Sequence, residues 1–149
     1  MTGLRLLAQD EEDLRILSTY LQDASLRAGD LAYLPRARRF ALTLDRFCWE
    51  CATQGSATGL RVHAGLHFDG VLRARASKID RADPEMALKL LGIDFGGGRD
   101  GGGTIDLYFE GGGCVRLDVE CIDAALRDMD APRPDSAPQR RDLEEEGGR

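Results

Sequence analysis

The sequence predicts an α+β fold: a curled antiparallel sheet of about seven strands with one main N-terminal helix and a short second helix. Three observations predict it. Helical spacing of apolar residues occurs near the N-terminus, apolar and polar residues alternate along most later segments, and short turns separate these segments. Because short turns between neighbouring strands require antiparallel pairing, the sheet is expected to be antiparallel. A roll or a partly open barrel is expected, since curling limits the exposed edges of a sheet.

The N-terminal segment predicts a strand followed by the main helix. Leu4 to Ala8 is a short apolar run, which is typical of a strand. Asp10 has the position of a helix N-cap, because acidic residues follow it and suit the positive end of a helix dipole. The predicted buried stripe comprises Leu14, Leu17, Leu21 and Ala24. The helix is expected to end between Asp23 and Arg27.

The central segment changes to a period of two. Residues 31–44 predict two strands joined by a turn at Pro35 to Arg38. The alternation slips by one at Arg46-Phe47, which predicts a β-bulge. Leu60 to Phe68 is the clearest strand, because its apolar residues all have one parity. Asp69-Gly70 is either a tight hairpin turn or a bulge after which the same strand continues, and both alternatives stay open.

The C-terminal half predicts the short helix and the remaining strands. Asp83-Pro84-Glu85 is a helix start, and that helix is expected to stop at Gly92. Strands are expected at residues 93–95, 104–110 and 115–121, and another short helix at residues 123–129. The single domain therefore spans residues 1–129. Residues 130–149 form a charged tail with almost nothing to bury, which is expected to be disordered.

Composition excludes several classes of protein. The net charge of −6 argues against a nucleic-acid binder held by a general positive field. No apolar run approaches the ~20 residues that span a bilayer, so no membrane association is expected. The N-terminus becomes acidic before a signal-peptide core could form, which makes the cytoplasm the expected location. In that compartment the four cysteines are expected to be reduced thiols.

Charge is distributed unevenly along the chain. Residues 31–80 carry eight basic and four acidic groups, a balance of +4, so the remainder carries −10. A basic middle on an acidic body suits an anion or an acidic partner, whereas the alternative is a set of arginines on solvated strand faces. The candidate binding residues are Arg36, Arg38, Arg39, Arg61, Arg73 and Arg75, together with the outward-facing His63 and His67.

One cysteine and histidine pattern suggests a metal site. The pairs Cys48-x2-Cys51 and His63-x3-His67 resemble the ligands of a two-Cys, two-His zinc finger. The segment between the two pairs is one residue shorter than in such a finger. A finger requires both histidines on one helical turn, but an extended Leu60 to Phe68 separates their Cα atoms by ~13 Å. We therefore expect no metal at this site.

No pattern indicates a cofactor or a catalytic residue. The glycine runs lie between strands instead of preceding a helix, which disfavours a nucleotide site. No nucleophile elbow or phosphate-binding loop is present. Cys121 has the parity of a core residue, and Cys114 is expected to be exposed after a glycine turn.

Three segments of the chain carry a family resemblance. They are residues 4–50, "LHFDGVLRARASKID" and "GGGCVRLDVECIDAALRDM". Together they resemble a family of small bacterial proteins classified only as a domain of unknown function, over Leu4 to about Met129. The resemblance implies no activity, ligand or catalytic residue.

The expected function is a non-enzymatic cytoplasmic binding or regulatory module that contacts an unidentified protein partner through its sheet. The alternative is a small enzyme or small-molecule binder with a pocket on the concave side of the sheet, lined by Tyr33, Trp49, Cys51 or His67. The sheet interior discriminates between them. Filling of that interior by Leu42, Val62, Leu66, Leu107 and Leu117 favours the surface module.

Overall fold

A computed structural model describes residues 3–53, 59–98 and 102–134 of the chain. Two helices, two short 3-10 turns (η) and eleven strands make up this part of the structure. In chain order they are β1 (Arg5–Ala8), α1 (Glu11–Tyr20), β2 (Ser25–Arg27), η1 (Ala28–Asp30), β3 (Leu31–Leu34), η2 (Pro35–Ala37), β4 (Arg39–Phe47), α2 (Trp49–Thr53), β5 (Leu60–Asp69), β6 (Val71–Ser77), β7 (Ala87–Gly97), β8 (Gly103–Phe109), β9 (Cys114–Val119), β10 (Ala124–Asp128) and β11 (Arg133–Pro134).

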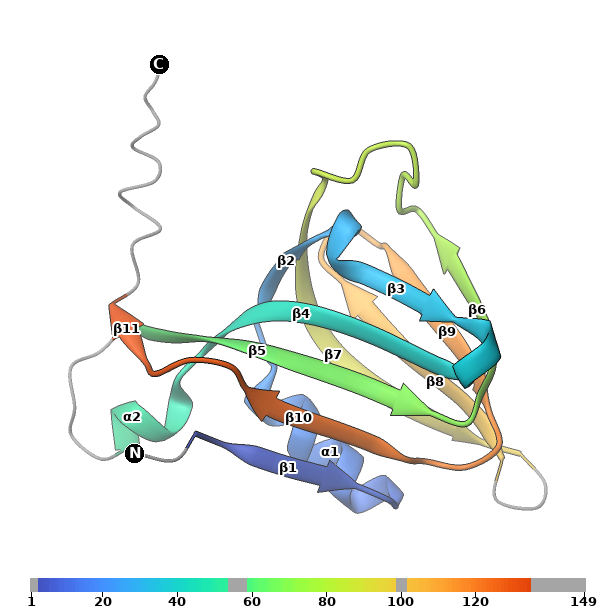
Figure 1. Ribbon diagram of the computed structural model, residues 1–149, viewed down its shortest axis with the longest axis horizontal. Coiled ribbons are helices and arrows are strands. Elements are labelled where there is room, and N and C mark those ends of the chain that lie inside the picture. Colours follow the sequence, from blue (N-terminus) through green and yellow to red (C-terminus); the bar gives the residue numbers. More distant parts are fainter. Residues whose placement is uncertain (1–2, 54–58, 99–101, 135–149) are drawn as a thin grey trace.

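The strands form one antiparallel sheet in the order β1-β10-β5-β4-β2-β7-β8-β9-β6, with β3 added to β4 and β11 to β5 (Figure 1). The predicted α+β class with an antiparallel sheet is confirmed. The described residues contribute 11 strands, more than the predicted number of about seven. The additional strands include β2 and β11, which are too short to show an alternation in the sequence.

Strand β2 joins the two halves of the sheet. Its Ser25 is the register partner of Asp45 in β4 and of Lys89 in β7. On the far side, the Tyr33 hydroxyl donates a hydrogen bond to the Val71 carbonyl at 3.2 Å, which ties β3 to the start of β6. The two halves therefore face each other across a shared interior.

Helix α1 begins as the sequence predicts and ends earlier. The Asp10 carboxylate caps it by accepting from the Asp13 amide at 2.8 Å. The helix stops at Tyr20 instead of continuing to residues 23–27, because Asp23 takes a φ of 66° and its amide bonds the Leu90 carbonyl of β7. The predicted stripe of Leu14, Leu17, Leu21 and Ala24 is nevertheless buried. It packs α1 and the segment after it against β1 and β7.

Strand β4 contains no bulge at Arg46-Phe47, so that prediction is wrong. Its register with β5 runs without a shift from Arg39 opposite Asp69 to Phe47 opposite Arg61. The apparent slip arises because Arg46 occupies an inward position that the alternation reserves for an apolar residue. A buried arginine therefore imitates the sequence signal of a bulge.

Two predicted helices in the C-terminal half are strands. The segment expected to be helical from Asp83 makes a turn, in which the Asp83 carboxylate accepts from the Glu85 amide, and then enters β7. Residues 123–129 likewise contain β10 between β1 and β5. In both cases the long-range ladder outweighs the local helix signals, and the apolar residues alternate instead of following a helical period. The second helix is α2, which follows β4.

The Asp69-Gly70 corner matches neither alternative from the sequence. Gly70 adopts a φ of +72°, and the chain turns there between β5 and β6. Strand β6 pairs with β9, whereas β5 pairs with β4, β10 and β11. The corner therefore carries the chain from one half of the sheet to the other.

The interior between the two halves is filled. Leu42, Leu66, Leu107 and Leu117 are buried in the main core, and Val62 is buried in a smaller cluster with Cys48 and Cys51. In the part of the chain that the structure describes, no helix has the length and apolar character needed to cross a membrane.

The predicted tail is described only at its beginning. Arg133–Pro134 form β11 and pair with Arg61 and Leu60 of β5. The remainder of the predicted tail, residues 135–149, lies outside the described residues, as do residues 99–101 in one of the glycine runs. The sheet contacts of the chain therefore extend beyond the predicted domain boundary at residue 129.

Candidate functional site

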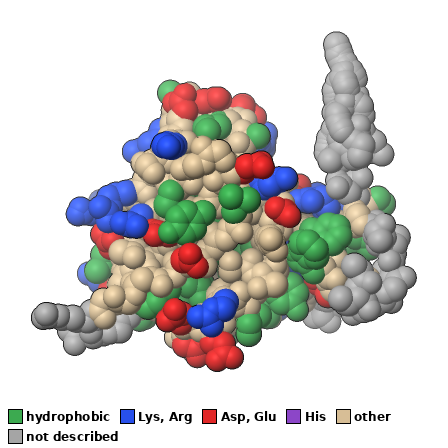
Figure 2. Space-filling model, turned by 180° about the vertical axis from the view of Figure 1, so that it is seen from behind, with side chains coloured by type: hydrophobic (Ala, Val, Ile, Leu, Met, Phe, Trp, Pro, Cys, Tyr) green, Lys and Arg blue, Asp and Glu red, His purple; other side chains and the backbone are tan. Residues whose placement is uncertain are grey.

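The predicted basic residues do not form one patch. Arg38 pairs with Glu120 at 3.2 Å, and both Arg73 and Arg75 pair with Asp118, at 3.7 and 3.1 Å. Arg36 is exposed in η2. On the side of the molecule opposite to Figure 1, acidic and basic side chains are interspersed (Figure 2). Most of the positive charge in residues 31–80 is therefore matched locally.

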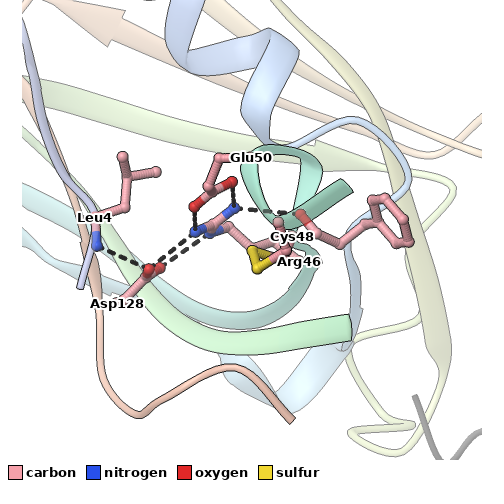
Figure 3. The surroundings of a disulfide bond; sticks show 7 residues. Leu4, Arg46, Cys48, Glu50 and Asp128 are labelled. Carbon is pink, nitrogen blue, oxygen red and sulfur yellow. Dashed lines mark hydrogen bonds and ion pairs between the residues drawn. A yellow bond between two sulfur atoms is a disulfide. The ribbon is translucent and has the colours of Figure 1, made fainter. Parts of the chain in front are cut away.

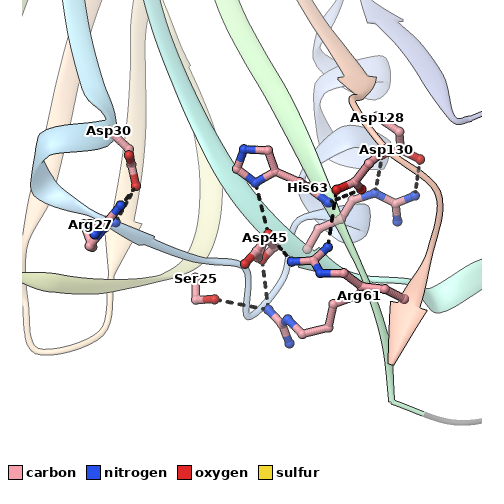
Figure 4. Close-up of polar contacts among 10 residues, drawn as sticks. Ser25, Arg27, Asp30, Asp45, Arg61, His63, Asp128 and Asp130 are labelled. Atoms are coloured by element: carbon pink, nitrogen blue, oxygen red, sulfur yellow. Dashed lines mark hydrogen bonds and ion pairs between the residues drawn. The ribbon is translucent and has the colours of Figure 1, made fainter. Parts of the chain in front are cut away.

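Arg61 and His63 belong to a cluster around Asp45 (Figure 4). The Asp45 carboxylate contacts His63 Nδ1 at 3.1 Å and accepts from Arg133 at 3.0 Å, while Arg61 donates to the Asp45 carbonyl at 2.9 Å. Burial raises the pKa of Asp45, but the hydrogen bonds from Arg133 and His63 outweigh it and hold that pKa below its ordinary value. The cluster fastens β11 to β4 and β5.

The remaining predicted residues, Arg39 and His67, lie in a groove on the outer face of β1, β10, β5, β4 and β3. We call this the outer groove, and its volume is about 780 Å³. Its floor is formed by small outward-facing residues, among them Ala41, Gly65 and Ala125. Because these side chains are short, the backbone of three neighbouring strands lies low between the longer side chains around it.

One row of residues crosses this floor and ends on two arginines. Thr43 lies opposite Gly65, Gly65 opposite Arg127, and Arg127 opposite Arg5. Both arginines are exposed, and both line the outer groove. Among the residues that the structure describes, neither guanidinium has a carboxylate within ion-pair distance. Like charges opposite each other destabilise a ladder, so an anion that binds both arginines would relieve their repulsion.

The other end of the groove is charged but internally paired. Arg39 donates to both oxygens of Asp69, at 2.7 and 3.3 Å, and Asp69 lies 3.4 Å from His67 Nδ1. The hydrogen bond from Arg39 is the main cause that lowers the pKa of Asp69 below its ordinary value. This end of the groove therefore offers polar contacts, whereas Arg5 and Arg127 offer uncompensated charge.

A disulfide lies at the end of β4, so the expectation of four reduced thiols is wrong. Cys48 and Cys51 are bonded, with Cα atoms 5.3 Å apart. The turn of α2 places residues three apart on one side of the chain, which brings both sulfur atoms together. Cys114 and Cys121 are free thiols. Cys114 is half-buried and Cys121 is exposed, the reverse of the prediction, because β9 ends at Val119 before Cys121 could point inward.

Arg46 lies beside this disulfide and is completely buried (Figure 3). Its guanidinium donates two hydrogen bonds of 2.9 Å to Asp128 and also pairs with both oxygens of Glu50. Asp128 in turn accepts from the Leu4 amide at 2.9 Å. Burial lowers the pKa of Arg46, but the hydrogen bonds that Arg46 donates to Asp128 and Glu50 outweigh it and raise that pKa above its ordinary value. The same arginine holds the pKa of Glu50 below its ordinary value, although burial acts in the opposite direction.

The two histidines of the zinc-like pattern stand apart from the cysteines. Leu60 to Phe68 is extended, as predicted, and His63 and His67 both face outward on β5. Within residues 3–53, 59–98 and 102–134, no group of three or more His, Cys, Asp or Glu side chains could hold a metal ion.

Arg5 and Arg127 do not stand out in the sequence. Arg5 lies outside the basic middle, and Arg127 lies in a segment that local signals assign to a helix. Alternation in the segment Ala124–Asp128 is the one signal that could have placed Arg127 on an outward face. The proximity of the two arginines comes from the pairing of β1 with β10, which are far apart in the sequence, so no local pattern encodes it.

Comparisons with known proteins assign a family and no activity. Residues 4–140 match the model of the DUF2948 family, described as "Protein of unknown function". No curated protein and no solved structure matches the chain.

Proposed function

The chain belongs to that family, whose description names no activity, and we propose that it is a non-enzymatic cytoplasmic binding module that holds an acidic segment of a protein partner in the outer groove. The observation that carries this proposal is the Arg5 and Arg127 pair. Arg5 and Arg127 are opposite each other on neighbouring strands and both line the groove, and neither guanidinium has an acidic partner among the described residues.

The filled interior supports a surface function. Leu42, Leu66, Leu107 and Leu117 fill the interior between the two halves of the sheet, where the alternative function requires an open pocket. The residues suggested for a concave pocket do not converge. Tyr33 donates to the Val71 carbonyl, and Cys51 is in the disulfide. Trp49 is exposed beside Phe47, and His67 faces outward. The outer face is therefore the better candidate for recognition.

The chemistry of the groove favours carboxylates on an extended segment. A guanidinium binds a carboxylate through two parallel hydrogen bonds, and two arginines side by side can hold two carboxylates of one chain. The floor of small residues leaves room for a backbone to lie across the strands. Leu7 and Met129, which are 72% and 55% exposed, provide apolar contacts at the rim of the same groove.

The selectivity of this site comes from its local charge. The chain as a whole carries −6, so an acidic partner is repelled elsewhere and attracted mainly at the groove. Because Arg5 and Arg127 are exposed, salt weakens the attraction, and binding is expected to be tighter at low ionic strength.

The test uses a fluorescently labelled oligoglutamate peptide and the full chain. The double substitution Arg5→Gln and Arg127→Gln is expected to weaken peptide binding about tenfold or more in fluorescence anisotropy, since two charge-assisted contacts are lost. The matched control is Arg73→Gln with Arg75→Gln, which removes two arginines already paired with Asp118 and leaves binding unchanged.

Stability provides an internal control for this experiment. Removing a like-charge pair from the β1–β10 ladder is expected to leave thermal stability unchanged or raised, so lost binding would not reflect unfolding. Equal binding by the wild-type chain and both double variants would contradict the proposal. So would an absence of binding by the wild-type chain at low ionic strength.

A further inference from the structure

We propose that Cys48 and Cys51 form a reversible thiol–disulfide site that reacts with a dithiol, and that its redox state regulates the outer groove through Arg46 and Asp128. The chemical part of this proposal stands by itself. The regulatory part rests on the function proposed above.

The separation of the two cysteines indicates a reactive bond more than a structural one. They are three residues apart, so the bond closes a very small loop and contributes little loop-closure entropy to stability. It also connects no distant elements, because both cysteines lie at the junction of β4 and α2. Cys-x-x-Cys is the spacing of dithiol redox centres. In the cytoplasm that we propose for this chain, disulfides are usually transient and redox-active.

A pocket gives a small dithiol access to the bond. Its volume is about 500 Å³, and both cysteines line it together with Leu4, Glu50 and Asp128. Cys51 is 8% exposed and Cys48 is 1% exposed, so Cys51 is the more accessible of the two residues. Because both cysteines are buried, a compact dithiol that enters this pocket is a better reductant than a protein surface.

The dithiol supplies the two electrons that reduce the disulfide. A thiolate of the dithiol attacks the sulfur of Cys51, the sulfur–sulfur bond breaks, and the Cys48 sulfur leaves as a thiolate that takes up a proton. The second thiol of the dithiol, once deprotonated, then attacks its own sulfur in the mixed disulfide and releases Cys51, which is protonated. Two electrons and two protons pass to the protein, and the dithiol becomes a cyclic disulfide.

A short chain of contacts leads from this bond to Leu4 and Asp128, which are next to the arginine pair in the sequence (Figure 3). Glu50 lies between the two cysteines in the sequence and pairs with Arg46. Arg46 also holds Asp128, and Asp128 accepts from the Leu4 amide. Leu4 and Asp128 are the sequence neighbours of Arg5 and Arg127. Opening the disulfide frees the short helix α2 and loosens Glu50, which weakens the support of the strands that present the two arginines.

The chain contains its own reporter for the reaction. Trp49 is its one tryptophan and stands next to Cys48, with its ring packed edge-on against Phe47 at a centroid distance of 4.5 Å. The first measurement titrates the folded full chain with reduced and oxidised dithiothreitol and records Trp49 emission and the number of alkylated cysteines by mass spectrometry. We expect a reversible two-electron transition without loss of the far-ultraviolet circular dichroism of the sheet.

Two double variants test whether the transition belongs to Cys48 and Cys51. Cys114→Ser with Cys121→Ser retains the transition, because both residues are free thiols elsewhere in the structure. Cys48→Ser with Cys51→Ser abolishes it. A bond that dithiothreitol reduces only after denaturation in urea would overturn the chemical part of the proposal. Failure of the reduced pair to re-form the bond with oxidised dithiothreitol would do the same.

The second measurement separates regulation from function. The oligoglutamate peptide is expected to bind the reduced chain about fivefold more weakly than the oxidised chain. Equal binding in the two states would refute regulation and leave the groove proposal standing. A peptide that binds neither state would refute the groove proposal and with it the regulation, while Trp49 emission and alkylation still decide the exchange chemistry.

Discussion

At the scale of single residues, Arg46 is the most constrained side chain near the candidate sites. It is a fully buried cation, and each of its two carboxylate partners comes from a different element. A buried charge is tolerable only when its hydrogen bonds are satisfied, and removal of one member leaves the others uncompensated. Arg46 therefore acts as a connector between α2 and β10 more than as a binding residue.

Arg46→Ala is accordingly expected to destabilise the protein strongly. Loss of the guanidinium leaves Asp128 buried without its main partner, and breaking a buried ion pair costs about 3–5 kcal/mol. Urea denaturation of the full chain measures this change. Arg15→Ala is the control, since Arg15 pairs with Glu11 on the exposed face of α1 and such pairs contribute about 0–1 kcal/mol. Similar losses for the two variants would contradict this account.

At the scale of elements, the β8–β9 ladder contains a second well-built ion pair. Asp106 in β8 is opposite Arg116 in β9 and accepts from it at 2.8 and 2.9 Å. The Tyr108 hydroxyl also donates to Asp106 at 3.1 Å. The hydrogen bond from Arg116 is the largest of the causes that lower the pKa of Asp106 below its ordinary value of 3.8.

This pair predicts an acid-dependent loss of stability. Because the pKa of Asp106 is lower in the folded state, the unfolded chain binds its proton first as the pH falls. The stabilisation is therefore complete above the ordinary value of 3.8 and is lost as the pH falls through the lowered folded pKa. Urea denaturation between neutral pH and pH values below that point measures it. Asp106→Asn should be less stable at neutral pH and show a flatter acid dependence, and an unchanged slope would contradict the assignment.

At the scale of the whole molecule, the two halves of the sheet share one core and one connecting strand. Leu42 and Leu66 from one half belong to the same buried cluster as Leu107 and Leu117 from the other. Strand β2 pairs with β4 and with β7, so separation of the halves breaks a ladder as well as exposing the core. Neither half is expected to persist alone.

Cooperative unfolding follows from this arrangement. Thermal and urea denaturation are expected to give one transition that is the same by far-ultraviolet and near-ultraviolet circular dichroism, with equal calorimetric and van't Hoff enthalpies. Leu26→Ala, in β2, should shift this single transition to lower temperature without splitting it. Two separated transitions in either protein would contradict a shared core.

Local patterns in the sequence were sufficient to predict an element wherever a strand has a strong alternation or a helix end has a clear capping residue. These features are the Asp10 cap, the turn at Pro35, the extended Leu60 to Phe68, and the inward Leu107 and Leu117, which all depend on neighbours in the sequence. The same alternation predicted that His67 faces outward, and His67 lines the outer groove. The uneven charge of residues 31–80 indicated Arg39, the other charged residue of the groove that the sequence predicted as a binding residue.

The remaining features could not be predicted from local patterns and are seen only in the folded chain. The strands β7 and β10 carry helix-like local signals, and only their long-range partners make them strands. Arg46 imitates a bulge until Asp128, 82 residues away, is seen to neutralise it. The Arg5 and Arg127 pair likewise joins opposite ends of the described chain. Periodicity and capping therefore determined the local elements of this protein, whereas contacts between distant residues decided its strand order, its buried charge and its groove, because those energies arise only when the chain closes on itself.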